Sequence, residues 1–285
     1  MTMRALVAEA DAALREGPHP ERARLDAESL LLHLLNQNRA WLLANWETEA
    51  SPEIETAFGK LIARRSSGKP LQYITGMAEF FGLPFQVAPG ALIPRPETEH
   101  LVEEVLRLAQ IQAPEASRIA DIGTGSGAIS VALAHSLPNA RLTATDLSPQ
   151  ALSIARENAA KNHVSERIEF VEGDLLAPLS GQSFTIIASN PPYIPNSDLE
   201  SLSVEVREYE PHSALFAGED GLTVYRRLIP DAYHLLLPGG WLVLEIGFGQ
   251  QQSIQTLLEQ SFYTEIHFIA DYQGIPRVAV GRKNE

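Results

Sequence analysis

The 285-residue sequence contains no cysteine, which excludes disulfide bonds, thiolate metal ligands and a cysteine nucleophile. Apolar runs are also short, because none approaches the roughly 18 residues that indicate a membrane span. The first residues, MTMRALVAEADAALREG, carry acids and lack the apolar core of a secretory signal. We therefore expect a cytoplasmic protein without a membrane partner.

Positive charge is scarce: 22 Lys and Arg stand against 36 Asp and Glu, a net charge of −14. An acidic surface repels a phosphate backbone, so we expect no direct nucleic-acid partner. The 8 histidines show no ligand spacing such as HExxH, so no metal is expected.

The chain length predicts about two domains. Residues 1–70 hold 9 basic and 10 acidic side chains, so nearly all the net charge lies in the remainder. Within residues 1–70, apolar residues recur at helical spacing, and Pro20 and Pro52 stand where helices start. We predict a helical bundle over residues 1–75, interpreted as a substrate-docking domain. A linker with a β-hairpin follows over residues 76–96, where Gly and Pro interrupt short apolar runs.

Residues 97–285 alternate β-rich runs with helical stretches, which predicts an α/β fold with a largely parallel sheet. The buried runs are RIADIG, RLTATD, RIEFVEGD, FTIIASN and WLVLEIG. Two further strands between Thr264 and Val280 are expected to form an antiparallel edge. Ligands bind at the carboxyl ends of parallel strands, so the polar residues there are the candidate site.

The strongest local motif is DIGTGSG, which runs from Asp121 to Gly127. Its glycines permit a tight turn and close approach of a ligand, and the following helix offers free N–H groups. Asp146 ends the next strand, where an acid binds ribose hydroxyls. The motif predicts a nucleoside-type cofactor and leaves NAD and S-adenosylmethionine both open.

A second motif, Asn190-Pro191-Pro192-Tyr193, directly follows the strand FTIIAS. The two prolines make the turn rigid. The side-chain oxygen of Asn190 and the carbonyl of Pro191 can accept the two N–H groups of a planar amide or amine, and Tyr193 can pack on its plane. This arrangement favours methyl transfer to nitrogen over hydride transfer.

Together, DIGTGSGAIS, TATDLSPQAL, SNPPYI and LIPRPETEHLVE resemble the HemK/PrmC family, the glutamine N5-methyltransferases of peptide-chain release factors. The runs PLQYITG, EFFG, EPHSALFAGEDGL, LPGGWLVLEIG and DYQGIPR match in order, so the similarity covers nearly the whole chain. IPRPETE and EPHSALFAGEDGL are narrower signals than DIGTGSG, which many methyltransferases share.

The resemblance implies a seven-stranded Rossmann-like S-adenosylmethionine-dependent methyltransferase sheet with a small N-terminal helical bundle. It implies that Asn190 to Tyr193 hold the glutamine of the release factor GGQ motif. The cofactor residues that it implies are Asp121, Gly123, Thr124, Gly125, Ser126, Gly127, Asp146, Leu147, Asp174, Leu175, Asn190, Arg95 and Glu97. Glu97 suits the first turn of the following helix equally well.

Three alternatives remain open. The first is a glutamine methyltransferase of a ribosomal protein, which would use the same turn. The second is an adenine-N6 nucleic-acid methyltransferase, which the acidic charge disfavours. The third is a cofactor-binding protein without catalysis, which the intact Asn190 turn disfavours. We expect a monomeric enzyme that transfers the methyl group directly. For Glu245, at the end of WLVLEI, we expect either substrate contact or a buried acid held by backbone N–H groups.

Overall fold

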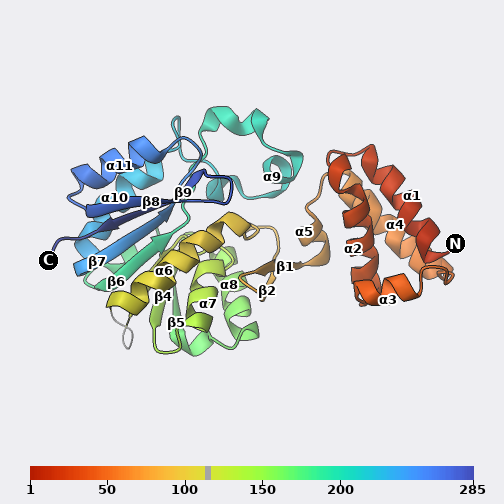
Figure 1. Cartoon of the computed structure of the whole chain (residues 1–285), viewed down its shortest axis with the longest axis horizontal. Coiled ribbons are helices and arrows are strands. Elements are labelled where there is room, and N and C mark those ends of the chain that lie inside the picture. The colour runs from red at the N-terminus through yellow and green to blue at the C-terminus, as the bar shows by residue number, and fades with distance from the viewer. Residues whose placement is uncertain (113–116) are drawn as a thin grey trace. The chain divides into compact units, whose positions relative to one another are not determined.

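The computed structural model describes residues 1–112 and 117–285 (Figure 1). The chain divides into two compact units, Met1–Met77 with Ser201–Tyr209, and Ala78–Glu200 with Glu210–Glu285. The sequence predicts residues 97–285 as one catalytic domain, whereas residues 201–209 pack with the helical unit.

The helical unit contains α1 (Met3–Arg15), α2 (Ala23–Leu35), α3 (Arg39–Ala44), α4 (Pro52–Ser66), α5 (Leu71–Thr75) and α9 (Val204–Tyr209). The helix starts expected at two prolines are confirmed: a 3-10 turn begins at Pro20 and α4 begins at Pro52. The hydroxyl of Ser51 caps α4 by accepting the N–H of Ile54. The apolar faces of α1, α2 and α4 form one core.

Helix α9 is fixed within this unit by a buried charge cluster. Nη1 of Arg65 lies 2.5 Å from Oε1 of Glu205, and Nε of Arg65 donates to Oδ2 of Asp26 at 2.6 Å. Arg65 and Asp26 are each only 2% exposed. The hydroxyl of Tyr209 donates to the carbonyl oxygen of Ser67 at 3.1 Å. These contacts explain why a segment so late in the sequence belongs to the N-terminal unit.

The second unit is built on a seven-stranded sheet of order β5-β4-β3-β6-β7-β9-β8. Its strands are β3 (Arg118–Ile122), β4 (Arg141–Asp146), β5 (Ile168–Glu172), β6 (Phe184–Ser189), β7 (Leu236–Glu245), β8 (Thr264–Ala270) and β9 (Pro276–Arg282). The neighbours from β5 to β7 are parallel, and β9 runs antiparallel to both β7 and β8. The predicted parallel sheet with an antiparallel edge is confirmed.

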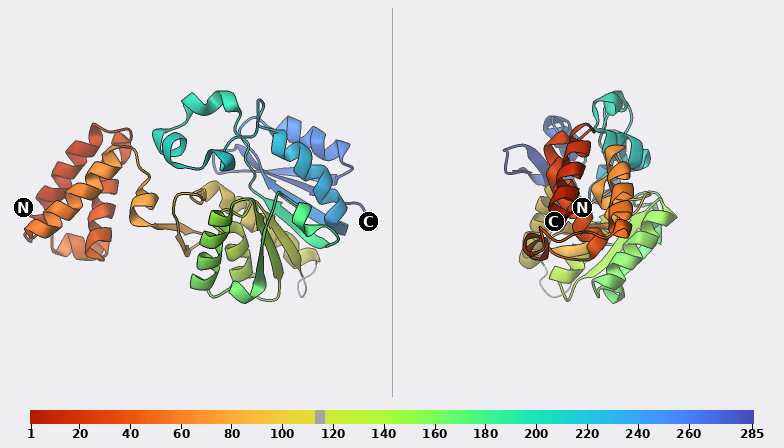
Figure 2. Two further views of the ribbon diagram at one scale, coloured as in Figure 1. Left: turned by 180° about the vertical axis from the view of Figure 1, so that it is seen from behind. Right: turned by 90° about the vertical axis from the view of Figure 1, so that its right-hand side faces the viewer.

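Helices cover both faces of the sheet (Figures 1 and 2). On one side lie α6 (Glu99–Gln112), α7 (Ala128–Ser136) and α8 (Pro149–Lys161), and on the other lie α10 (Thr223–Leu235) and α11 (Gln251–Gln260). Along β6, Ile186 and Ala188 pack in the first layer and Ile187 in the second. Both faces of this strand are covered, so all of its residues are buried and most of them are apolar. No helix in the described ranges combines the length and apolarity needed to cross a bilayer.

The predicted hairpin is present as a separate two-stranded sheet of β1 (Met77–Phe80) and β2 (Leu83–Gln86). Asn158 of α8 holds it by two hydrogen bonds, from the N–H of Gln86 to Oδ1 at 2.6 Å and from Nδ2 to the carbonyl of Gln86 at 3.0 Å. Asn158 also donates to the carbonyl of Ser126 at 2.9 Å. One helix therefore anchors both the linker and the glycine-rich turn.

Candidate active site

The glycine-rich turn joins β3 to α7, and its three glycines have positive φ angles of 73°, 56° and 81° at Gly123, Gly125 and Gly127. A Cβ built on Gly123 or Gly125 would meet no atom within 4 Å, whereas one on Gly127 would lie 3.1 Å from the Cβ of Ala155. The first two glycines therefore leave the backbone open to a ligand. The third allows α7 and α8 to pack closely.

Asp121 supports this turn from inside the protein. Its Oδ2 accepts the hydroxyl of Thr124 at 2.6 Å and the N–H of Ser130 at 3.1 Å. Burial raises the pKa of Asp121 to about 6, although these hydrogen bonds oppose the shift. Asp121 is fully buried, and its Oδ1 has no hydrogen-bond partner among the described residues.

Asp146, at the end of β4, is joined directly to the same turn. Its Oδ2 accepts the N–H of Gly125 at 2.8 Å, and its Oδ1 accepts the N–H of Ser148 at 2.8 Å. Each carboxylate oxygen has a further lone pair with which to accept a hydroxyl group. The structure thus places a fixed double acceptor beside an open backbone, which is the arrangement that a ribose requires.

A pocket of about 490 Å³ lies at this carboxyl edge of the sheet, and its size suits a small-molecule site. The predicted site residues that line it are Arg95, Gly123, Thr124, Gly125, Ser126, Asp146, Leu147, Asp174, Leu175, Asn190 and Pro192. The leucine at 147 is 68% exposed despite being apolar, so it offers a surface on which a planar ring can lie. The open glycine backbone, the paired acceptor and the apolar wall fit a nucleoside cofactor.

Five predicted residues are not among those that line this pocket: Asp121, Gly127, Glu97, Pro191 and Tyr193. The first two hold the turn, as described above. Glu97 is exposed within the 3-10 turn Pro96–Thr98 that precedes α6, which agrees with its interpretation as a helix-start residue. The contacts of these residues with cofactor or substrate stay predictions.

The pocket is also lined by residues that are not among the predicted site residues. Arg227 of α10 lies on its wall, with Nη2 2.5 Å from Oδ2 of Asp174. Pro211, Ser213 and Ala214 also line it. These three lie in the run EPHSALFAGEDGL, so a sequence signal for them existed. Arg227 had none, because it stands in an ordinary amphipathic helix.

The side chain of Asn190 reaches a chain of buried hydroxyl and carboxyl groups. Its Nδ2 donates to Oγ1 of Thr98 at 3.1 Å, and the hydroxyl of Thr98 donates to Oε2 of Glu245 at 2.6 Å. The hydroxyl of Tyr193 donates to Oε1 of Glu245 at 3.4 Å. Glu245 is a buried acid, as expected, but side-chain hydroxyls are its partners where backbone N–H groups were expected. Burial raises the pKa of Glu245 to about 7.

Arg95 is held at the edge of the pocket by an ion pair. Its Nη2 donates to Oε1 of Glu210 at 2.6 Å, and Glu210 is only 4% exposed. A charge pair with one buried partner has a restricted geometry, so the guanidinium group is fixed in place.

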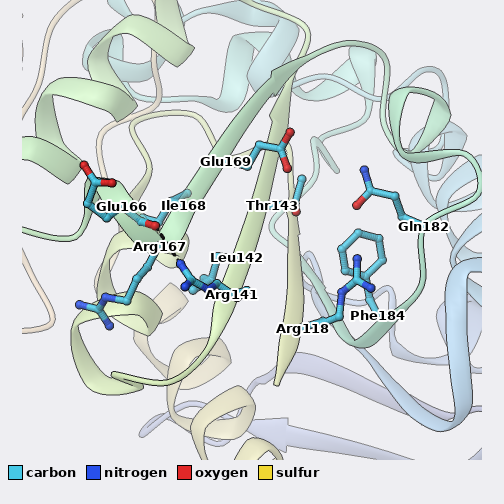
Figure 3. Close-up of a pocket in the computed structure, with 10 residues that line it drawn as sticks. All are labelled: Arg118, Arg141, Leu142, Thr143, Glu166, Arg167, Ile168, Glu169, Gln182 and Phe184. Carbon is cyan, nitrogen blue, oxygen red and sulfur yellow. Dashed lines mark hydrogen bonds between the residues drawn. The ribbon is translucent and has the colours of Figure 1, made fainter. Parts of the chain in front are cut away.

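A second hollow of about 420 Å³ lies at the opposite, amino edge of the sheet (Figure 3). Arg118, Arg141 and Arg167 line it together with Glu166 and Glu169. Nη1 of Arg141 donates to the carbonyl of Glu166 at 3.0 Å. None of the predicted site residues lines this hollow, and its charges are of both signs. The described residues also contain no group of three or more His, Cys, Asp or Glu that could hold a metal.

Comparison with solved structures shows the fold. A methyltransferase from Pyrococcus furiosus superposes with a TM-score of 0.52 at 19% identity and covers 72% of this chain and 91% of its own. A 16S rRNA N2 G1207 methyltransferase of T. thermophilus, solved with AdoMet and guanosine, gives 0.54 at 18% identity over 73% of this chain and 50% of its own. The second unit, which contains the seven-stranded sheet, therefore has a methyltransferase fold.

Two family descriptions match the sequence, "PrmC N-terminal domain" over residues 5–76 and "Methyltransferase small domain" over residues 103–205. A release factor glutamine methyltransferase of Moorella thermoacetica is 45% identical over an alignment of 286 positions that covers 100% of each chain. One of Geobacter sulfurreducens is 45% identical over 262 residues, covering 92% of this chain and 90% of the relative. With this similarity over nearly its full length, the chain belongs to the release factor glutamine methyltransferase family.

Proposed function

We propose that this protein transfers a methyl group from S-adenosylmethionine to the side-chain amide nitrogen, N5, of a glutamine in peptide-chain release factors. Relatives bearing the name release factor glutamine methyltransferase support this substrate. The GGQ motif as the site of modification follows from the family resemblance.

The observation that carries the proposal is the position of Asn190 on the same pocket as the glycine turn. An amide nitrogen is a poor nucleophile because its lone pair is delocalised into the carbonyl group. The Oδ1 of Asn190 and the carbonyl of Pro191 would accept its two N–H groups and align the nitrogen. They would also stabilise the positive charge that develops there.

The cofactor would be held by Asp146 and by the open backbone at Gly123 and Gly125, with Leu147 against its adenine. When bound, S-adenosylmethionine would supply a methyl group from its sulfonium, with the electron pair of the carbon–sulfur bond staying on sulfur. The amide nitrogen would gain that methyl group and give up one proton to solvent. The protein's share of the catalysis is alignment and exclusion of water.

Charge supports a protein substrate over nucleic acid. Residues 71–285 carry 26 acidic against 13 basic side chains, whereas binding to nucleic acid needs a basic track. The alternative of a ribosomal-protein substrate shares the same turn and is not favoured by the names of the relatives. We further propose that the enzyme is a monomer and that it acts in the cytoplasm, where release factors are found.

The test is an assay with tritiated S-adenosylmethionine that compares a release factor, a ribosomal protein and double-stranded DNA as acceptors. We expect label in the release factor alone. Asn190→Ala should lose almost all transfer while its affinity for the cofactor stays close to the wild-type value. Asn196→Ala, an exposed asparagine just beyond the turn, is the matched control and should keep full activity. Label in DNA, or normal turnover by Asn190→Ala, would contradict the proposal.

A further inference from the structure

The two ends of the Asn190 side chain are not equivalent for catalysis. A side-chain amide has an oxygen that accepts hydrogen bonds and an NH2 group that donates them, and the two are nearly equal in shape. Only the oxygen can bind the N–H groups of a substrate amide. A half-turn flip of Asn190 would set donors against donors, so the active enzyme needs a group that fixes the orientation.

The contact with Thr98 provides that selection. The hydroxyl of Thr98 has one hydrogen, which it gives to Oε2 of Glu245 at 2.6 Å. Its oxygen then has only lone pairs left for Asn190, so it accepts from Nδ2 at 3.1 Å and has no hydrogen to offer to Oδ1. The carboxylate of Glu245, two hydrogen bonds away from Asn190, thereby sets which group donates and which accepts in both of these hydrogen bonds.

The surroundings hold the hydrogen bonds between Asn190, Thr98 and Glu245 in place. Thr98 is 4% exposed and Glu245 is 2% exposed, so water does not compete for their hydrogen bonds. The hydroxyl of Tyr193 donates to the other oxygen of Glu245 at 3.4 Å, which ties in the far end of the same turn. The hydroxyl of Tyr225 donates to the main-chain oxygen of Glu245 at 2.6 Å and fixes the end of β7.

We propose that Glu245 and Thr98 are positioning residues for methyl transfer, which hold Asn190 with its amide oxygen toward the substrate nitrogen. The proposal rests on the proposed function, because it takes a planar amide as the acceptor. Neither residue makes or breaks a bond to the substrate. Glu245 acts through Thr98, and Thr98 acts through the orientation of Asn190.

Two isosteric variants test this role. Thr98→Val removes the hydroxyl and keeps the shape. Glu245→Gln can donate its NH2 to Thr98, which frees the threonine hydrogen to turn toward Asn190. We expect each to lower kcat toward release factor by about 10- to 100-fold, because the acceptor is misaligned. The dissociation constant for S-adenosylmethionine, measured by calorimetry, should stay within about twofold. Asp146 and the glycine turn are untouched, and Thr98→Val keeps the shape of the pocket wall, which Thr98 helps to line.

Two comparisons separate positioning from general damage. Thr98→Ser keeps the hydroxyl and should keep kcat within about threefold of wild type. The double variant Thr98→Val, Glu245→Gln should be no worse than either single variant, because both act through one chain of hydrogen bonds. Thr185→Val is the matched control: its buried hydroxyl bonds the main chain of Arg118 at the other end of β6. It should lower the melting temperature without changing kcat.

A readout that needs neither cofactor nor activity is the side-chain NH2 signal of Asn190 in 15N–1H spectra, assigned by its loss in Asn190→Ala. In the wild type its hydrogen bond should slow exchange with solvent, and in Thr98→Val and Glu245→Gln exchange should speed up. Wild-type kcat and slow exchange in a folded Thr98→Val variant would overturn the positioning role. If the wild type fails to methylate release factor, the proposed function fails, while the exchange measurement still decides the orientation of Asn190.

Discussion

Asp146 accepts the backbone N–H of Gly125 at 2.8 Å, so the acid that ends β4 is fastened to the glycine turn that follows β3. The carboxylate therefore orders the turn, and in the proposed function it would also offer acceptors to a ribose. Its loss should affect cofactor binding twice, through the missing acceptor and through a looser backbone.

We expect Asp146→Ala to raise the dissociation constant for S-adenosylmethionine by at least about tenfold, since hydrogen bonds to a charged group are lost. Isothermal calorimetry measures this directly. Glu172→Ala is the matched control, because Glu172 ends the neighbouring strand in register with Asp146 but is not among the residues lining the pocket. An unchanged constant for Asp146→Ala would remove the ribose assignment.

The activity should depend on pH through Glu245. Burial raises the pKa of this carboxyl from 4.5 to about 7, with Glu97 adding to the rise and the Thr98 and Tyr193 hydroxyls and Arg277 opposing it. The ionised carboxyl accepts from both hydroxyls, whereas the protonated form carries an O–H that acts as a donor and competes with this arrangement. At saturating cofactor and release factor, kcat should therefore rise with pH through about 7, and Glu245→Gln should lack this limb. If kcat of Glu245→Gln rose with pH at the same midpoint, the rise would belong to the titration of another group.

The same shift predicts the sign of a stability effect. The folded pKa of Glu245 lies above the unfolded value of 4.5, so between these values the folded state binds more protons. Its contribution to the free energy of unfolding is complete below about 4.5 and is lost as pH rises through about 7. Denaturant titrations should show the wild type losing stability relative to Glu245→Gln across this window.

The buried pair of Arg65 and Asp26 should control the stability of the helical unit. Arg65→Met removes the nearer and buried partner of Asp26 and leaves it only the more distant Arg22, at 3.6 Å, so we expect the free energy of unfolding to fall by about 3 kcal/mol. It also releases Glu205 of α9. Arg64→Met, at the exposed neighbouring position of α4, should change stability by no more than about 0.5 kcal/mol. Equal changes in the free energy of unfolding for Arg65→Met and Arg64→Met would show that the buried pair does not stabilise the helical unit.

The helical unit is proposed to dock the release factor, and its exposed leucines test this. Leu25 and Leu43 are 59% and 64% exposed. If they contact the substrate protein, Leu25→Ser or Leu43→Ser should raise KM for whole release factor by about fivefold. KM for a short glutamine-containing peptide should not change. Leu237→Ser, which alters an exposed leucine of the second unit, is the control. Equal increases for protein and peptide would contradict docking by this unit.

Much of the second unit was predictable because its central strands, such as β6, are buried on both faces. FTIIAS is a mainly apolar run, and its apolar residues alternate between two cores. The start of β7 was not predicted, because Pro238 and two glycines interrupt its sequence. In the structure Phe184 of β6 pairs with Leu236 and Ile186 pairs with Trp241, so the proline and the two glycines of β7 lie in a register shift between these pairs. Such a shift depends on the partner strand and leaves no signal in the local sequence.

The glycine turn and Asp146 were predictable because each follows its own strand at a fixed spacing. The contact between Thr98 and Glu245 was not, since these residues are 147 positions apart and neither belongs to a local pattern. The same holds for Arg65 and Glu205, which bring residues 201–209 into the helical unit. Local motifs thus locate the groups that face the pocket, and tertiary packing decides what holds them.

The most direct test of the account is mass spectrometry of a release factor incubated with this enzyme and S-adenosylmethionine, followed by fragmentation to locate the change. We predict a gain of one methyl group on the side-chain nitrogen of a single glutamine, the glutamine of the GGQ motif, and no gain with Asn190→Ala. A methyl group on any other residue, or none on the release factor, would contradict the central claim.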